Sequence, residues 1–211
     1  NRIGGSEFDF MGQRVDLHGV PGTKDDGKGN VYHGMVRSSA KWEVESKGFD
    51  ARGAYIRLAI GSDEIGEIGQ YFGKMRLEVT YRLKGNKLTI ESQITNQDTK
   101  DVITSLAFHP WFKTPNKSQW QVKLPANAYW PSQNQLPTGS PADVGKTEFD
   151  LREQADIGAR TYDDVFTSLN KVDGMAVSSI FNPMDNTLIK VSQDQGYPHV
   201  VFYIPGDKDA V

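Results

Sequence analysis

The sequence predicts an all-β protein of antiparallel strands, and three observations lead to that fold class. Apolar and polar residues alternate with a period of two in the strongest segments, as expected of strands with one buried face. Gly, Asn, Asp and Pro interrupt the apolar segments at intervals of roughly eight to twelve residues, which is typical of sandwiches and barrels. Helical signals are few: segment 62–73, with three glycines, predicts a turn or short helix, and 150–159 a single turn.

The clearest strands are two consecutive segments near the middle of the chain. In KMRLEVTYRL, residues 74–83, every second residue is apolar. The next segment, GNKLTIESQITN, residues 85–96, places Leu88 and Ile90 in the same alternation. The polar residues Lys84–Asn86 between the two segments predict the turn of a hairpin.

Further short strands are predicted before and after this hairpin, in segments 46–60, 120–131, 174–183, 186–194 and 199–205. Two stretches rich in glycine and proline, 18–34 and 134–151, predict long loops, which are often functional. No linker divides the chain, so we expect a single domain over residues 1–211. Because the chain starts without Met and stops just after a strand-like segment, we expect this domain to be incomplete at both ends.

The composition excludes several classes of function. With 37% hydrophobic and 24% charged residues, the 211-residue chain can bury a core. A net charge of −3 with mixed signs, and no apolar segment near the roughly 20 residues of a membrane span, predict a soluble protein with no nucleic-acid or membrane partner. There is no cysteine, and the four histidines form no HxxxH or HxH pair, so neither a metal nor a cofactor is predicted.

One histidine stands inside an unusually apolar segment, LAFHPWFK, residues 106–113. His109 is either a buried structural group or a titratable ring held at the edge of a pocket to move a proton. Pro110 stiffens the backbone after it, and Trp111 adds an aromatic face. Aromatic faces beside a polar group suit a sugar ring, whose CH groups stack while its hydroxyls form hydrogen bonds.

Other polar residues give weaker signals. His33 precedes Gly34, which would let a ligand approach the backbone closely. His18 and His199 are interpreted as structural or surface residues. The paired acids in TYDDVF, residues 161–166, indicate either a turn or a carboxylate that accepts hydrogen bonds from a ligand.

The order of these signals resembles the aldose 1-epimerase (galactose mutarotase) family over essentially the whole chain. The similar motifs are NRI at 1–3, YHGMVR at 32–37, FHPWF at 108–112, LPTG at 136–139, DDVF at 163–166 and VVFYIP at 200–205. The resemblance implies a galactose-mutarotase-like β-supersandwich of large twisted antiparallel sheets. It also implies an isomerase that interconverts the α and β anomers of a hexose without a cofactor. A base removes the proton of the C1 hydroxyl, an acid protonates the ring oxygen, and the ring opens and closes again.

The resemblance assigns roles to residues of this sequence. His109 matches the general-acid histidine, and His33 matches the histidine that hydrogen-bonds the sugar near its ring oxygen. Asp163, rather than its neighbour, matches the carboxylate that holds sugar hydroxyls, and Arg2 matches an arginine that contacts the sugar. Trp111 is expected at the pocket wall, although a core position would suit a tryptophan equally well.

One part of the family pattern is missing. The family's general base is a glutamate just after the strand that VVFYIP resembles, and its opening strands precede NRI. We therefore expect this sequence to be an internal portion of a longer protein that lacks the N-terminal strands and the C-terminal catalytic glutamate. Without that glutamate, activity should be lost or very low.

Two alternatives remain open at this stage. A hexose-phosphate epimerase would need cations such as Arg2, Arg14 and Arg37 to converge on a phosphate. A non-catalytic carbohydrate-binding module would keep the sugar pocket without turnover. A structural β-sandwich with no ligand would leave the two histidine motifs unexplained. The resemblance further implies a cytoplasmic protein that is a monomer or a weak dimer.

Overall fold

The structure is a computed structural model that describes residues 2–20, 22–37, 39–65, 71–206 and 208–211. Over these residues the chain forms two compact units, Asn1–Leu106 and Ala107–Val211. Both units are built from antiparallel strands, which confirms the all-β prediction.

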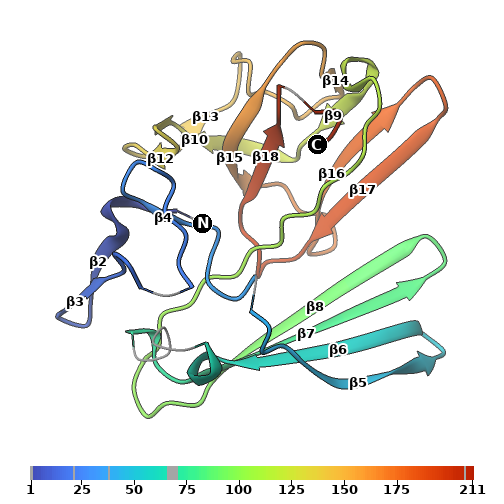
Figure 1. Ribbon diagram of the computed structural model, residues 1–211. Coiled ribbons are helices and arrows are strands. Elements are labelled where there is room, and N and C mark those ends of the chain that lie inside the picture. Colours follow the sequence, from blue (N-terminus) through green and yellow to red (C-terminus); the bar gives the residue numbers. More distant parts are fainter. Residues whose placement is uncertain (1, 21, 38, 66–70, 207) are drawn as a thin grey trace. The chain divides into compact units, whose positions relative to one another are not determined.

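The first unit contains one large sheet, with strand order β5-β6-β7-β8 (Figure 1). Its strands are β5 (Glu43–Asp50), β6 (Gly53–Gly61), β7 (Met75–Lys84) and β8 (Lys87–Asn96). Strands β7 and β8 form the predicted hairpin, paired from Met75↔Asn96 to Lys84↔Lys87. The turn itself is two residues, 85–86, one fewer than predicted, because Lys84 remains paired in β7.

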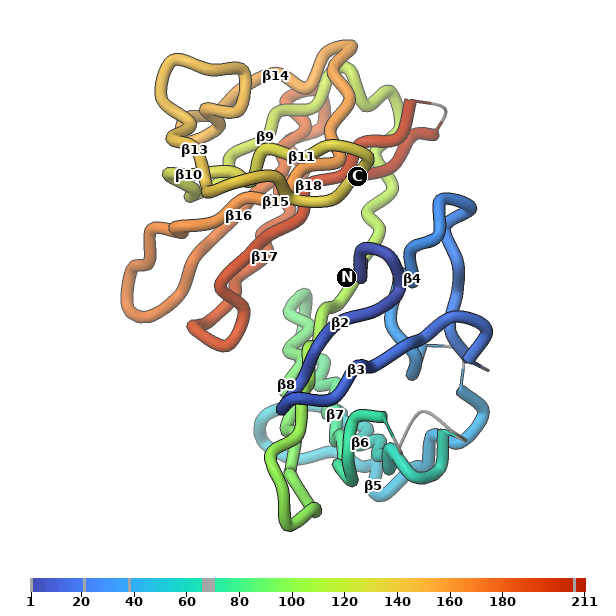
Figure 2. The backbone as a smooth tube through the Cα atoms, turned by 90° about the vertical axis from the view of Figure 1, so that its left-hand side faces the viewer, coloured from blue at the N-terminus to red at the C-terminus, as the bar shows by residue number. Residues whose placement is uncertain are grey.

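The beginning of the first unit is made of short elements. They are β1 (Arg2–Ile3), the 3₁₀ turn η1 (Gly4–Ser6), β2 (Glu7–Phe10), β3 (Gln13–Asp16) and β4 (Val31–Tyr32). Figure 2 shows β2 and β3 as a hairpin and β4 beside the start of the chain, where it pairs with β1. A small core forms around the buried side chains of Val15, Leu17 and Val31. The described residues of the predicted loop, 18–20 and 22–34, are irregular apart from β4 and an isolated bridge from Asp25 to Val31.

The second unit contains two four-stranded sheets, ordered β13-β10-β15-β18 and β14-β9-β16-β17. Their strands are β9 (Gln121–Lys123), β10 (Ala126–Trp130), β13 (Ala142–Asp143), β14 (Ala155–Asp156), β15 (Tyr162–Leu169), β16 (Ala176–Asn182), β17 (Thr187–Gln193) and β18 (Val200–Ile204). β11 (Ser132–Gln133) and β12 (Leu136–Pro137) form a short hairpin. β11 precedes the predicted loop 134–151, and β12 lies within it. Strands β9, β10, β16, β17 and β18 lie in the segments predicted after residue 120, whereas β13, β14 and β15 were not predicted. The turn offered for residues 161–166 is wrong, because β15 is held there by pairing with β10 and β18.

The core of the second unit lies between its two sheets. Phe166 of β15 and Ile204 of β18 come from one sheet, and Val122 of β9 and Ile180 of β16 come from the other. Phe166 is fully buried and meets the ring of Phe149 at a centroid distance of 6.3 Å. Burial of large apolar side chains from both sheets is the main force that joins them.

The two helical signals have different outcomes. The turn predicted in 62–73 is present as the 3₁₀ turn η2 (Ser62–Glu64), while residues 66–70 lie outside the described residues. The single helical turn predicted in 150–159 is wrong, because Ala155–Asp156 forms strand β14 against β9. Another 3₁₀ turn, η3 (Lys117–Gln119), precedes β9.

Candidate functional site

His109 belongs to the second unit, in an extended segment that is not part of a sheet. Phe112 fixes this segment, since its N–H and C=O both hydrogen-bond Val211, at 2.8 and 3.0 Å, and its ring packs on the core. His109 itself is exposed, and its imidazole stacks on the indole of Trp111 at 5.2 Å between centroids. The structure therefore resolves the question that the sequence leaves open: His109 is a surface group beside an aromatic face, not a buried structural histidine.

Trp111 connects His109 to the sheet. The indole is 49% exposed, which excludes the core position that the sequence allows. Its edge meets the ring of Tyr203 on β18, with centroids 5.5 Å apart and ring planes at 80°. Tyr203 is paired with Asp163 on the neighbouring strand β15. Directly opposed residues of two strands project from the same face of a sheet, so Asp163 lies on the face that carries Tyr203.

The two acids of TYDDVF differ in their surroundings. Asp163 is exposed and accepts a short hydrogen bond from the side-chain amide of Gln135. Asp164 is half-buried and paired with Phe202 on the core-facing side of the sheet. Burial raises the pKa of the Asp164 carboxyl, and the negative charges of Asp163 and Glu148 raise it further. Only Asp163 is therefore placed to receive hydroxyl groups from solvent.

The sequence reasoning missed Gln135 and Tyr203. Gln135 lies in the two-residue turn between β11 and β12, where it and Asn134 both have positive φ, 64° and 53°. Such a backbone favours glycine or asparagine, so a glutamine there is strained, as is common at functional sites. The strain could not be read from the sequence. The sequence signal for Tyr203 was hidden because it stands in a continuous apolar segment.

Arg2 and His33 belong to the first unit and meet the same tyrosine. The guanidinium of Arg2 lies 5.4 Å from the ring centre of Tyr32, its partner in the β1–β4 pair. The imidazole of His33 meets the ring of Tyr32 edge to face, with centroids 4.1 Å apart. His33 is exposed and has a left-handed backbone with φ 68°, continued by Gly34 at 69°. Histidine adopts this conformation more readily than most side chains, so the turn at His33 is accommodated without glycine.

The five predicted residues thus form two groups, one in each unit. His109 and Trp111 touch directly, and Trp111 meets Tyr203, the strand partner of Asp163, while Arg2 and His33 both contact Tyr32. The first group offers a titratable imidazole, a flat apolar face and a carboxylate. The second offers a cation and an imidazole. Within the second unit, the imidazole, the flat apolar face and the carboxylate are groups that suit a polyol ring.

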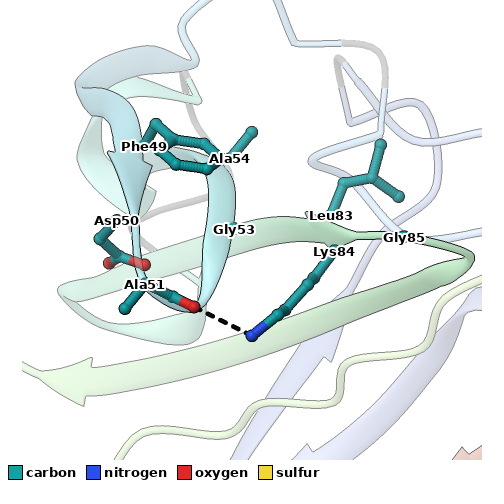
Figure 3. A pocket seen from close by; sticks show the side chains of 8 residues that line it. All are labelled: Phe49, Asp50, Ala51, Gly53, Ala54, Leu83, Lys84 and Gly85. Atoms are coloured by element: carbon teal, nitrogen blue, oxygen red, sulfur yellow. Dashed lines mark hydrogen bonds between the residues drawn. The ribbon is translucent and has the colours of Figure 1, made fainter.

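A hollow of about 400 Å³ occurs elsewhere, at the turn ends of β5, β6 and β7 (Figure 3). Phe49, Ala54 and Leu83 line it together with Lys84, whose ammonium donates to the carbonyl oxygen of Ala51 at 3.0 Å. Its walls are mainly aliphatic and it carries no imidazole, so we do not place the candidate site there. Within the described ranges, no cluster of three or more acids and histidines has a metal-binding arrangement, and no helix is long and apolar enough to cross a membrane.

Comparisons with known proteins agree with these observations. The family model described as aldose 1-epimerase matches residues 1–211. Galactose mutarotase of Sus scrofa is 33% identical over 168 residues, which cover 75% of this chain and 44% of that protein. Galactose mutarotase of Homo sapiens is 32% identical over 144 residues, which cover 64% of this chain and 39% of that protein. The chain therefore spans less than half the length of these relatives.

Two solved structures share the fold. A protein of Escherichia coli K12 assigned as an aldose 1-epimerase superposes with a TM-score of 0.69 at 19% identity, covering 97% of this chain and 62% of that one. Galactose 1-epimerase from Lactobacillus acidophilus NCFM gives 0.62 at 17% identity, covering 84% and 55%. These likenesses confirm the galactose-mutarotase-like fold. Because the family model matches the whole sequence, this chain belongs to the aldose 1-epimerase family.

Proposed function

We propose that the protein containing this chain is a mutarotase that interconverts the α and β anomers of a hexose. The observation that carries the proposal is the exposed imidazole of His109 stacked on Trp111, whose indole meets Tyr203, the residue directly opposite Asp163 in the sheet. This surface pairs an apolar face with groups that donate and accept protons. Membership of the aldose 1-epimerase family supports the same reaction.

The chemistry requires one acid and one base. A carboxylate takes the proton from the C1 hydroxyl, the C1–O5 bond breaks, and His109 gives its proton to O5, so that the open aldehyde forms. After rotation about C1–C2, O5 returns its proton to His109 and attacks C1, while the base returns a proton to O1. We assign no residue of this chain to the base.

The remaining groups bind the sugar. Asp163 accepts hydrogen bonds from hydroxyl groups, and the indole of Trp111 stacks on ring CH groups. For the first unit, the family resemblance implies that Arg2 contacts the sugar and that His33 hydrogen-bonds it near the ring oxygen. A histidine suits the role of acid because its ordinary pKa of about 6.5 lets it give and take a proton near neutral pH.

An unphosphorylated hexose fits the arginines better than a hexose phosphate. Arg14, one of the candidate phosphate ligands, forms ion pairs with Glu7 at 2.5 Å and Asp9 at 3.2 Å on its own hairpin. Arg2 forms an ion pair with Asp26 at 3.1 Å. Carboxylates that already neutralise these cations weaken the attraction for a phosphate dianion.

The test is polarimetry on freshly dissolved α-D-glucose and α-D-galactose with protein expressed from the whole gene. We expect optical rotation to relax faster than in buffer, and His109→Ala to abolish the acceleration. His199→Ala is the matched control, since His199 is another exposed histidine of the same unit and should leave the rate unchanged. Sugar binding without acceleration would replace the proposal by a non-catalytic carbohydrate-binding protein. Acceleration only with a phosphorylated hexose would favour the hexose-phosphate alternative.

A further inference from the structure

Asp26 lies in the glycine-rich loop 18–34, and its side chain is only 4% exposed. Its Oδ1 accepts the backbone N–H groups of Lys28 at 2.8 Å and Asn30 at 3.1 Å. Its Oδ2 accepts the side-chain N–H of Asn30 at 2.9 Å and lies 3.1 Å from Nε of Arg2. A carboxylate this enclosed is stable as an anion only when such partners surround it.

The same loop is tied to the backbone just after Arg2. Asn30 is 5% exposed, and its Oδ1 accepts the backbone N–H of Gly5 at 2.9 Å. The hydroxyl of Ser6 donates to the carbonyl oxygen of Gly29 at 2.8 Å. These contacts, together with the ion pair, join the loop and the segment that carries Arg2 into one hydrogen-bonded block.

Two cations lie near the ring of Tyr32. The ammonium of Lys24 lies 5.0 Å from the ring centre of Tyr32, and the guanidinium of Arg2 lies 5.4 Å from the same centre. A long arginine side chain has many rotamers, and an aromatic face alone does not select one of them. The carboxylate of Asp26, 3.1 Å from Nε of Arg2, favours one arrangement of the guanidinium.

The protonation of Asp26 agrees with this role. Burial alone would raise the pKa of its carboxyl, but hydrogen bonds from Asn30 and Lys28 and the charge of Arg2 lower it below the ordinary value. Asp26 therefore stays ionised throughout the neutral range, as an anchor for a guanidinium must.

We propose that Asp26 is a positioning residue that holds Arg2 in the orientation in which its guanidinium donates to the hydroxyls of the sugar. It contacts Arg2 and the loop that leads to His33, and it acts on the ligand through them. The proposal rests on the proposed function only for the identity of the ligand, because the contact between Asp26 and Arg2 is independent of any sugar.

The activity test uses Asp26→Asn, which removes the charge but keeps an acceptor for the backbone N–H groups. We expect KM for the hexose to rise about five- to tenfold with kcat within about twofold, because Arg2 binds ground state and transition state alike. Asp26→Glu should restore part of the loss. Asp25→Asn is the matched control. Asp25 is the neighbour of Asp26, and its carboxylate accepts the N–H of Gly27 at 2.6 Å. Because the ion pair of Arg2 is with Asp26, loss of the charge of Asp25 should leave KM unchanged.

A double-mutant cycle separates positioning from a merely structural role. On an Arg2→Ala background, Asp26→Asn should add little further loss in KM, since Asp26 acts through Arg2. Equal losses on both backgrounds, or a KM in Asp25→Asn raised as much, would overturn the proposal.

A readout without sugar keeps the two proposals distinguishable. In ¹⁵N NMR the Nε–H of Arg2 should exchange slowly with solvent in the wild type and in Asp25→Asn, and rapidly in Asp26→Asn. If Asp26→Asn fails to fold, the carboxyl of Asp26 can be titrated by ¹³C NMR, where Arg2→Ala should raise its pKa. Unchanged exchange, or an unchanged pKa, would refute the positioning role even if the protein is a mutarotase. If the Nε–H of Arg2 exchanges slowly in the wild type and rapidly in Asp26→Asn, but the protein has no mutarotase activity, only the proposed function is refuted.

Discussion

Replacing Trp111 by alanine should weaken sugar binding while leaving the fold intact. The indole is 49% exposed, and its contacts in the second unit are to the rings of His109 and Tyr203. A tryptophan has roughly 150–250 Å² of surface to cover, so about 100 Å² of Trp111 is accessible. A sugar stacked on one side would cover about half of that area, or roughly 50 Å².

The expected loss follows from this area. At about 25 cal/mol for each Å² of apolar surface, 50 Å² corresponds to about 1.2 kcal/mol of binding free energy. This is roughly an eightfold increase in the dissociation constant. Trp111→Phe keeps a smaller aromatic face and should lose only about half as much free energy.

The assay is isothermal titration calorimetry with galactose and glucose, supported by thermal unfolding of each variant. A midpoint within about 2 °C of the wild type would confirm that the half-exposed ring contributes little to stability. An unchanged dissociation constant in a folded Trp111→Ala protein would refute the placement of the sugar against this ring. A loss equal in the alanine and phenylalanine variants would refute stacking as its cause.

Three further predictions concern stability. Phe166→Ala should lower the free energy of unfolding by about 3–5 kcal/mol in urea titrations, because it leaves a cavity in the core of the second unit. A loss under about 1 kcal/mol would contradict that packing. Burial, with nearby acids, raises the pKa of Asp164 above its ordinary 3.8, so the stability that its neutral form contributes is present below pH 3.8 and lost as pH rises through the raised pKa. Asp164→Asn should therefore stabilise the protein at pH 7 and have little effect on its stability at pH 3. Destabilisation at pH 7 would show that the folded protein favours the charged form of Asp164. Gly53→Ala should cost at least about 2 kcal/mol more than Gly85→Ala, because its Cβ would lie 2.3 Å from the carbonyl oxygen of Leu83 while Gly85 has open space; equal losses in chemical unfolding would contradict the clash.

The fold class could be predicted because the long strands of the first unit, and several strands of the second, show a local pattern in the sequence. In β7 and β8, one face is apolar and the other polar, so a period of two identifies the strands and their turn. The same reasoning failed in segment 150–159, because Ala155 and Asp156 form a strand only through pairing with β9. Pairing with a distant strand leaves no local signal in the sequence.

The candidate site was predicted in part for similar reasons. His109 and Asp163 stand out because polar groups interrupt apolar segments. Tyr203 does not, because Phe202 and Ile204 turn into the core and Tyr203 turns the other way, an alternation hidden when all three are apolar or aromatic. Asp26 was one of several acids in a loop, and only the fold brings it to Arg2.

The most direct test of the account is two-dimensional exchange NMR on glucose and galactose labelled with ¹³C at C1. The two anomers give separate C1 signals, so their exchange rate is measured at equilibrium and without a coupled assay. With protein from the whole gene, we predict cross peaks whose build-up rate rises in proportion to protein concentration and falls to the buffer rate in His109→Ala. An exchange rate equal to that in buffer at every protein concentration, for both sugars, would contradict the proposed mutarotase function.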